Sequence, residues 1–106
     1  EIMVVKKNGR KSSFDRDKLS KSVYIALKKR PIDTETAEKF ISKVSRALEE
    51  LGQSEISTNT IGTMVMEGLK ELDPVAYVRF ASVYRNFREE KDFVQFVDKL
   101  DVYKKS

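Results

Sequence analysis

The stretch VVKKNGRKSSFDRDKL, residues 4–19, contains the signals that set the beginning of the fold. Two segments with strand character, 2–7 and 10–14, flank the dipeptide Asn8-Gly9. This dipeptide favours a type I′ turn, because both of its residues tolerate positive φ. The stretch therefore predicts a β-hairpin at the start of the chain.

Five segments downstream of the hairpin carry apolar residues about every 3.6 positions, which predicts amphipathic helices. Each follows a residue that favours an N-cap. They run from Asp15 to about residue 30, from Asp33 or Thr34 to Leu51, from Ser57 or Thr58 to Leu72, from Asp73-Pro74 to Phe87, and from Asp92 to about residue 104. Pro31 and Gly52 are typical helix ends.

Three details of these helices can be tested against a structure. The periodicity places Leu51 and Val83 on inward faces, and the pair Asp92 and Gln95 resembles a capping box. Residues 55–57 form a short extended piece that we expect to pair with the hairpin. The fold class is therefore α+β: a small three-stranded sheet capping a bundle of four helices, with an extra C-terminal helix.

The composition limits the possible functions. The 106 residues suffice for one domain, 1–106, and they include neither Cys nor His. Disulfides, thiolate zinc sites and Ser-His or Cys-His catalytic pairs are therefore excluded, and no Asp/Asn/Gly cluster suggests an all-oxygen metal site. We expect no enzymatic activity. With no apolar run of roughly 20 residues and no secretory signal, we expect a cytoplasmic protein without membrane contact.

The charge is distributed unevenly. The chain carries a net charge of +4, made up of +7 in residues 1–30 and −3 in the remainder. A local excess of this kind predicts an electric field that attracts phosphate groups to the first third of the chain. A basic face that is merely solvated is the alternative, and charge alone does not separate the two.

Phosphate binding would have to use side chains, because neither GxxxxGK[ST] nor GxGxxG occurs. Lys6 and Lys7 alternate along the first strand, so only one of them faces the helices. Lys18 lies in the first turn of the first helix. A strand lysine and this helix lysine could clamp a triphosphate, assisted by the positive end of the helix. Solvated lysines on an edge hairpin are the alternative.

The segment AYVRFASVYRNFRE, residues 76–89, combines aromatic residues with arginines at helical spacing. For Phe80 and Phe87 a place in the core is the favoured interpretation. Aromatic and arginine enrichment on one helix is also typical of subunit contacts and of base-stacking surfaces.

Four stretches, in order and spacing, resemble the ATP-cone domain of the NrdR-type transcriptional repressors of ribonucleotide reductase genes. They are VVKKNGRKSSFDRDKL, KKRPID, SEISTNTIGTMVMEGLKELD and VAYVRFASVYRNFRE, and the resemblance covers roughly residues 2–97. The opening pattern is shared by ATP-cones in general, including those of reductases. The combination IGxxVMxxLxxLDxVAYVRFASVYRxF is what points to the repressors.

The resemblance implies a four-helix domain capped by a three-stranded sheet, a bound adenine nucleotide (ATP or dATP), and a homo-oligomer whose size depends on the nucleotide. The implied nucleotide contacts are Val4, Lys6, Lys7, Lys18, Thr58 and Arg88. Two positions depart from the pattern: Ser12 stands where ATP-cones often have Glu, and Glu89 stands near a basic position of reductase cones, for which Arg88 is a substitute.

Repressors of this family carry an N-terminal four-cysteine zinc ribbon that reads the DNA operator. This chain begins at Glu1 and has no Cys, so we expect it to be the sensing and assembly half, with zinc only in the ribbon. Candidate subunit contacts are the C-terminal helix, about 92–104, and the side chains of Tyr77, Arg79, Tyr84 and Phe93.

Three other functions stay open on the sequence alone. The basic first third could bind DNA directly, which predicts a steep loss of affinity with salt. The chain could be the ATP-cone allosteric domain of a reductase or another enzyme. It could also be a helical partner-binding module without nucleotide affinity.

Overall fold

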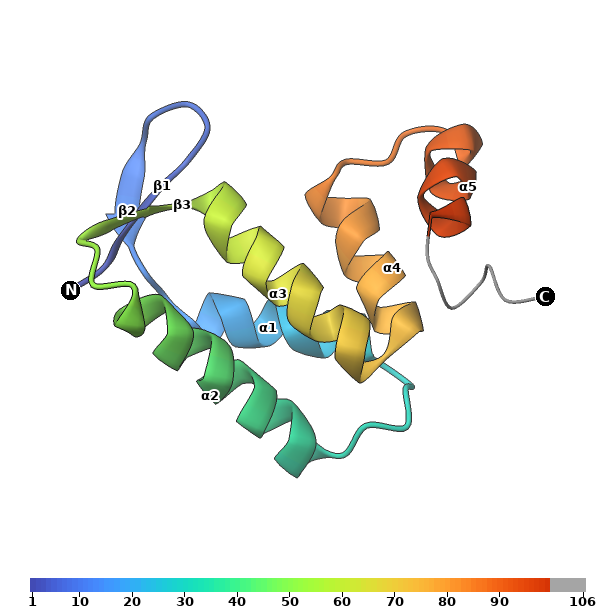
Figure 1. The fold of residues 1–106 in the computed structure, drawn as a ribbon, viewed down its shortest axis with the longest axis horizontal. Helices are drawn as coiled ribbons and strands as arrows, with labels where there is room; N and C mark the ends of the chain where they lie inside the picture. The colour runs from blue at the N-terminus through green and yellow to red at the C-terminus, as the bar shows by residue number, and fades with distance from the viewer. Residues whose placement is uncertain (100–106) are drawn as a thin grey trace.

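The structure, a computed structural model of the chain, describes residues 1–99 and, within them, all side chains but that of Phe93. A small sheet lies at one end of a bundle of helices, and a last helix lies beside the fourth (Figure 1). The elements are β1 (Met3–Val5), β2 (Lys11–Ser13), α1 (Arg16–Leu27), α2 (Thr34–Glu50), β3 (Glu55–Ser57), α3 (Thr58–Leu72), α4 (Pro74–Tyr84) and α5 (Glu90–Asp98). The predicted α+β class is confirmed; residues 100–104 of the predicted last helix lie outside the described residues.

The sheet has the order β2-β1-β3. β1 pairs antiparallel with β2, with Val4 opposite Ser12, and parallel with β3, with Val4 opposite Ile56. The third strand is thus confirmed. Ile56 is only 2% exposed, so its burial fixes β3, and with it the sheet, to the helices.

The hairpin turn differs from the predicted type I′ turn. Gly9 donates its N–H to the carbonyl of Lys6, and Lys6 donates to the carbonyl of Arg10, both at 2.8 Å. Gly9 has φ 86°, whereas the φ angle of Asn8 is not positive. The loop therefore has three residues with glycine last, the other common hairpin geometry. The Asn8 Oδ1 accepts from Arg10 N–H at 2.9 Å, which holds Asn8 in its conformation.

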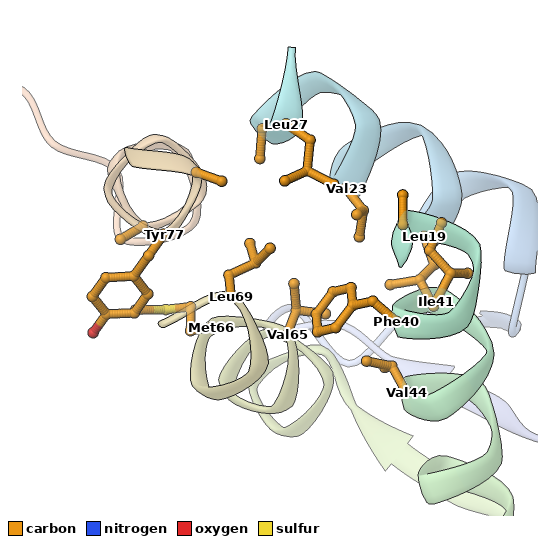
Figure 2. Packing of buried hydrophobic residues seen from close by; sticks show 14 of the residues in the cluster. Leu19, Val23, Leu27, Phe40, Ile41, Val44, Val65, Met66, Leu69 and Tyr77 are labelled. Carbon is orange, nitrogen blue, oxygen red and sulfur yellow. The ribbon is translucent and has the colours of Figure 1, made fainter. Parts of the chain in front are cut away.

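The apolar stripes of α1–α4 meet in one core (Figure 2). Its largest fully buried side chains are Ile41, Leu48, Ile56, Leu69, Val23 and Val65. The prediction that Leu51 and Val83 face inward is wrong. Leu51 is 43% exposed because it is the C-cap residue of α2, and Val83 is 81% exposed because a groove stays open between it and Ile25 of α1.

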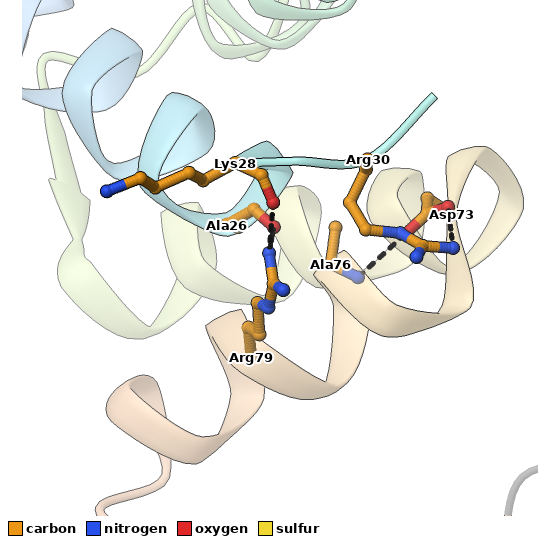
Figure 3. Close-up of polar contacts among 6 residues, drawn as sticks. All are labelled: Ala26, Lys28, Arg30, Asp73, Ala76 and Arg79. Carbon is orange, nitrogen blue, oxygen red and sulfur yellow. Dashed lines mark hydrogen bonds and ion pairs between the residues drawn. The ribbon is translucent and has the colours of Figure 1, made fainter. Parts of the chain in front are cut away.

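α1 ends at Leu27, earlier than Pro31 predicts. Lys28 has φ −54° and ψ 127°, Lys29 has φ 62°, and Arg30 donates its N–H to the Leu27 carbonyl at 2.9 Å, as in a type II turn. Arg79 of α4 donates to the carbonyls of Ala26 (3.1 Å) and Lys28 (2.6 Å) (Figure 3). Contacts with α4 thus fix the end of α1.

We expect Lys29→Gly to raise the free energy of unfolding by about 0.5–1 kcal/mol. A left-handed conformation costs a residue with a Cβ roughly 1–2 kcal/mol, and the greater freedom of glycine in the unfolded chain offsets part of the gain. Urea unfolding followed by circular dichroism measures the change. Lys28→Gly is the matched control, since Lys28 has negative φ and glycine there should lower stability. An unfolding midpoint of Lys29→Gly at or below that of the wild type would contradict a left-handed Lys29.

An ion pair joins the α1–α2 connection to α4. The Nε and Nη2 atoms of Arg30 donate to the two carboxylate oxygens of Asp73 at 2.8 and 3.1 Å (Figure 3). Asp73 also caps α4, accepting the Ala76 N–H at 2.9 Å, so the predicted helix start at Asp73-Pro74 is confirmed. Burial alone would raise the pKa of Asp73, but the hydrogen bonds from Arg30 and Ala76 and the charge of Arg30 outweigh it and hold this pKa below its usual value.

The start of α5 corrects the predicted capping box. The N-cap is Glu89, and Asp92 is the third helical residue, which accepts the Glu89 N–H at 3.2 Å. Hydrogen bonds from the backbone N–H groups of Arg88 and Glu89 lower the pKa of Asp92. Phe96 of α5 packs against Tyr77 of α4, with the ring centroids 5.2 Å apart, so α5 is attached to α4.

Candidate functional site

A cavity of about 250 Å³ lies where the sheet meets α1, α3 and α4, and we refer to it as the hairpin pocket. Every part of the fold except α2, β3 and α5 contributes to it. Its lining residues are Val4, Lys6, Ser12, Ser13, Phe14, Asp15, Lys18, Leu19, Ser22, Thr58, Ile61, Val65 and Phe80.

The hairpin places residues of both strands on the wall of this pocket. Val4 and Lys6 are two positions apart, so they share one side of the extended chain. Ser12 is opposite Val4 in the antiparallel register and therefore lies on the same face. Because the loop is held by hydrogen bonds between Lys6 and Arg10, Lys6 stays in line with β1.

Two helices begin at the pocket. The Oδ1 of Asp15 caps α1, accepting the N–H groups of Asp17 at 2.9 Å and Lys18 at 3.4 Å. The hydroxyl of Ser57 caps α3, accepting the Thr60 N–H at 3.1 Å, and Thr58 is the first residue of that helix. The positive ends of two helix dipoles therefore lie next to the same cavity, which favours a negatively charged ligand.

Within residues 1–99, no acidic side chain neutralises the ammonium groups at the pocket. Lys6 and Lys18 are both exposed, and neither takes part in an ion pair within residues 1–99. Asp15 is the one acid of the lining, and its carboxylate already accepts two backbone N–H groups. The pocket thus presents two cations to an anionic ligand.

The pocket also has an apolar part of its wall, formed by Phe14, Ile61, Val65 and Phe80. A second cavity of about 550 Å³, the α1–α4 groove, shares Ser22 and Phe80 with the pocket and includes the exposed side chains of Ile25 and Val83. Pockets for small molecules are typically about 300–1,000 Å³, so the hairpin pocket reaches that range only together with this groove. Such a site suits a ligand that is charged at one end and flat and apolar at the other.

Four of the predicted nucleotide contacts are brought together in the pocket: Val4, Lys6, Lys18 and Thr58. The other two lie elsewhere. Lys7 is exposed in the hairpin loop, and Arg88 is exposed between α4 and α5, where its N–H donates to Asp92 Oδ2 at 3.1 Å. Their contact with a ligand stays a prediction.

The predicted subunit contacts all have intramolecular roles where the structure describes them. Tyr77 is 8% exposed and packs on Phe96, and Arg79 holds the end of α1. The hydroxyl of Tyr84 lies 2.9 Å from the carbonyl and 2.7 Å from the Oδ1 of Asn59. The side chain of Phe93 is outside the described residues. A role of these residues in oligomers stays a prediction.

Sequence reasoning did not assign several lining residues to the site. Ser12 could have been found, because the hairpin register puts it beside Val4. No comparable sequence pattern assigns Ser22, Ile61 and Phe80 to the site. They come from three different helices, which only the packing of the bundle brings to one cavity.

No group of three or more His, Cys, Asp or Glu side chains within the described residues could hold a metal ion. The described helices are also too short or too polar to cross a bilayer.

Comparison with known proteins gives a consistent result. Residues 2–90 match the family of ATP cone domains. The chain is 95% identical over 105 residues to the transcriptional repressor NrdR of Pelagibacter ubique, covering 99% of this chain and 69% of that protein. It is 61% identical over 102 residues to NrdR of Azorhizobium caulinodans, covering 96% and 59%, and 55% identical over 100 residues to NrdR of Rhodospirillum rubrum, covering 94% and 66%. The chain thus spans between about three fifths and seven tenths of the length of these relatives.

Proposed function

Because the chain belongs to the NrdR family of transcriptional repressors and its residues 2–90 match the ATP cone domain, we propose that the hairpin pocket binds ATP or dATP. The domain is a nucleotide-sensing regulatory unit and not a catalyst. The names of the relatives, all transcriptional repressors, favour this function over the allosteric domain of an enzyme.

The observation that carries the proposal is the convergence of Lys6 and Lys18 on one cavity, with no ion pair to either lysine from the described part of the chain. A triphosphate carries several negative charges, and two lysines with two helix N-termini stabilise such a group. Thr58 adds a hydroxyl at the start of α3. We place the phosphates at this end of the pocket.

The nucleoside extends toward the apolar wall. The rings of Phe14 and Phe80 and the side chain of Ile61 supply flat and branched apolar surface, as adenine-sized groups require. Through Ser22 and Phe80 the ligand reaches the α1–α4 groove, which provides the remaining volume.

Helix α4 links the pocket to the face that we propose for assembly. Phe80 borders the ligand, while Tyr77 of the same helix contacts Phe96 of α5. Arg85, the C-cap residue of α4, also contacts Phe96, with its guanidinium 5.7 Å from the ring centre. A nucleotide that binds one arrangement of α4 and α5 better than another shifts the population of oligomers by that difference in affinity. The proposed contact surface is α4 and α5, with Tyr77, Arg79, Tyr84 and Phe93.

In the longer protein, this assembly sets whether zinc ribbons align on the operators of ribonucleotide reductase genes in the cytoplasm. Binding of dATP, a product of the deoxynucleotide supply, would then lower transcription. In this proposal the zinc ribbon of the longer protein contacts the DNA, holds the zinc and selects the operator, and residues 1–106 do not.

The first test is to denature the purified chain and identify the nucleotide that is released. The second is to measure the mass of the folded protein by light scattering without nucleotide, with ATP and with dATP. We expect an adenine nucleotide and a different mass in at least one nucleotide state. A chain that carries and binds no nucleotide would overturn the proposal. Tight binding to duplex DNA at moderate salt would instead support the direct DNA-binding alternative.

A further inference from the structure

A second groove of about 630 Å³ lies between α2 and α3, and we refer to it as the α2–α3 groove. It lies on a different face of α3 from the hairpin pocket, because the two cavities share no α3 residue. Its apolar lining consists of Phe40, Val44, Ala47, Met64 and Leu72. The proposed function makes no use of this groove.

The two sides of the groove carry opposite charges. Lys39 and Lys43 lie on the α2 side, and Glu67 and Glu71 lie on the α3 side, all exposed. No ion pair within the described residues crosses the groove; Lys39 contacts only Glu35 of its own helix, at 3.6 Å with both side chains 77% exposed. Lys43, Glu67 and Glu71 form no ion pair in residues 1–99. The basic and the acidic side are therefore both available to a partner.

The register of the helices aligns these charges. A Cβ atom at Gly68 would meet the Phe40 ring, so positions 40 and 68 lie at the same level. Because α2 ends and α3 begins on either side of the short β3, the two helices run in roughly opposite directions (Figure 1). Lys39 then lies within one turn of Glu71, and Lys43 within one turn of Glu67.

We propose that the α2–α3 groove is a self-complementary docking surface for a second copy of this chain. A two-fold axis parallel to the helices places α2 of one copy beside α3 of its partner, as in a four-helix bundle. Rotation about such an axis keeps every residue at the same height along the helices, and it places the α2 side of one groove opposite the α3 side of the other. Lys39 and Lys43 of each copy therefore face Glu71 and Glu67 of the other, whereas an axis across the groove would oppose Lys to Lys.

The apolar lining fits such a partner. The four facing helices enclose Phe40, Met64 and Leu72 from both copies, and the flexible Met64 side chain fills irregular space between them. The stems of the lysines cover the border of this apolar centre while their charged ends reach the glutamates. This surface is separate from the α4–α5 face and does not require a nucleotide.

The test is charge reversal in the nucleotide-free chain at low ionic strength, with the dimer dissociation constant measured by sedimentation equilibrium. K39E/K43E and E67K/E71K should each raise this constant about tenfold or more, because every exchanged pair becomes a repulsion. The quadruple variant should restore dimers, since reversing both sides recreates the pairs. An equimolar mixture of the two double variants should form heterodimers.

K21E/K28E, at an α1 position and at the C-cap of α1, is the matched control for K39E/K43E, because it makes the same change in net charge away from the groove. It should leave the dissociation constant close to that of the wild type. Circular dichroism confirms that each variant is folded. A wild-type chain that stays monomeric at millimolar concentration overturns the proposal. So do dimers that are insensitive to both reversals, or a quadruple variant that remains monomeric. ATP titration of the same variants keeps the result separate from nucleotide binding, which the reversals should not change.

Discussion

Replacing both Lys6 and Lys18 with alanine is expected to lower the affinity of the chain for ATP and dATP by about two orders of magnitude or more. A hydrogen bond to a charged group contributes about 1.5–3 kcal/mol, and about 1.4 kcal/mol corresponds to a tenfold change in affinity. Each single variant should therefore lose roughly tenfold or more. Isothermal titration calorimetry measures the dissociation constants directly.

A control variant separates this site from general charge attraction. Lys21→Ala is the control, because it removes an exposed lysine from α1 three residues beyond Lys18 that does not line the pocket. Lys7→Ala, in the hairpin loop, is measured beside it as a separate test, because Lys7 is a predicted contact. If long-range attraction alone held the nucleotide, all four substitutions would weaken binding by similar amounts and the effects would vanish at high salt. We expect a small change for Lys21→Ala. An equal loss in Lys21→Ala and Lys18→Ala would contradict the hairpin pocket as the phosphate site.

Lys7→Ala also tests a prediction that the structure leaves open. The resemblance assigns Lys7 to the nucleotide, whereas the hairpin places it outside the lining of the hairpin pocket. A loss in Lys7→Ala comparable to that in Lys6→Ala would show that the three-residue loop closes over the phosphates when a nucleotide binds.

Asp73→Ala should produce the largest loss of stability among the polar residues, about 3 kcal/mol in the free energy of unfolding. The Asp73 side chain is 6% exposed, and its carboxylate accepts hydrogen bonds from both Arg30 and the start of α4. Removing an N-cap costs about 0.5–2 kcal/mol, and breaking a buried pair so that one partner stays uncompensated costs about 3–5 kcal/mol. The value expected here is at the low end of the second range, because the Arg30 side chain is still 29% exposed.

Two variants divide this loss into its parts. Asp33→Ala removes a cap from α2 that also accepts the N–H three residues further on, but Asp33 forms no ion pair within residues 1–99, so its replacement should cost clearly less than Asp73→Ala. Asp73→Asn keeps an oxygen for the Ala76 N–H and removes the charge, so it should fall between the two. Urea unfolding at pH 7 provides all three values. If Asp73→Ala is no worse than Asp33→Ala, the Arg30 pair contributes nothing to stability.

The pH dependence of stability gives an independent measurement of the same contact. Despite the burial of Asp73, hydrogen bonds from Arg30 and Ala76 hold its pKa in the folded protein below the ordinary value of an aspartate carboxyl. The stabilisation by ionised Asp73 is therefore fully present above the unfolded pKa, and it is lost as the pH falls through the folded pKa. Between pH 5 and pH 2 the wild type should lose more stability than Asp73→Asn. Parallel curves for the two proteins would contradict a lowered pKa.

Much of the fold follows from local signals in the sequence. Helix starts depend on a side chain that caps the next few N–H groups, so Asp15, Asp33 and Asp73 identified α1, α2 and α4 correctly. The period of 3.6 identified the core residues of the same helices, because it depends only on the geometry of one helix. The resemblance added the site, with Val4, Lys6, Lys18 and Thr58 now found around one cavity.

Tertiary contacts decided the rest, for identifiable reasons. α1 ends at Leu27 because Arg79, 51 positions beyond Lys28, caps its carbonyls, and no local pattern reports a partner at that distance. Val83 lies in a good helical stripe but stays exposed, because α1 and α4 leave the α1–α4 groove between them.

The sequence by itself determined that this protein is a small α+β domain with helices at known starts and cations gathered near its beginning. Those features depend on residues that are close together in the sequence, and the local geometry of the backbone decides how such residues interact. Only the tertiary structure decided which cations share a cavity, which apolar residues remain on the surface and which ion pair joins the α1–α2 connection to α4. These depend on distances between segments that are far apart in the sequence, and such distances exist only once the core is packed.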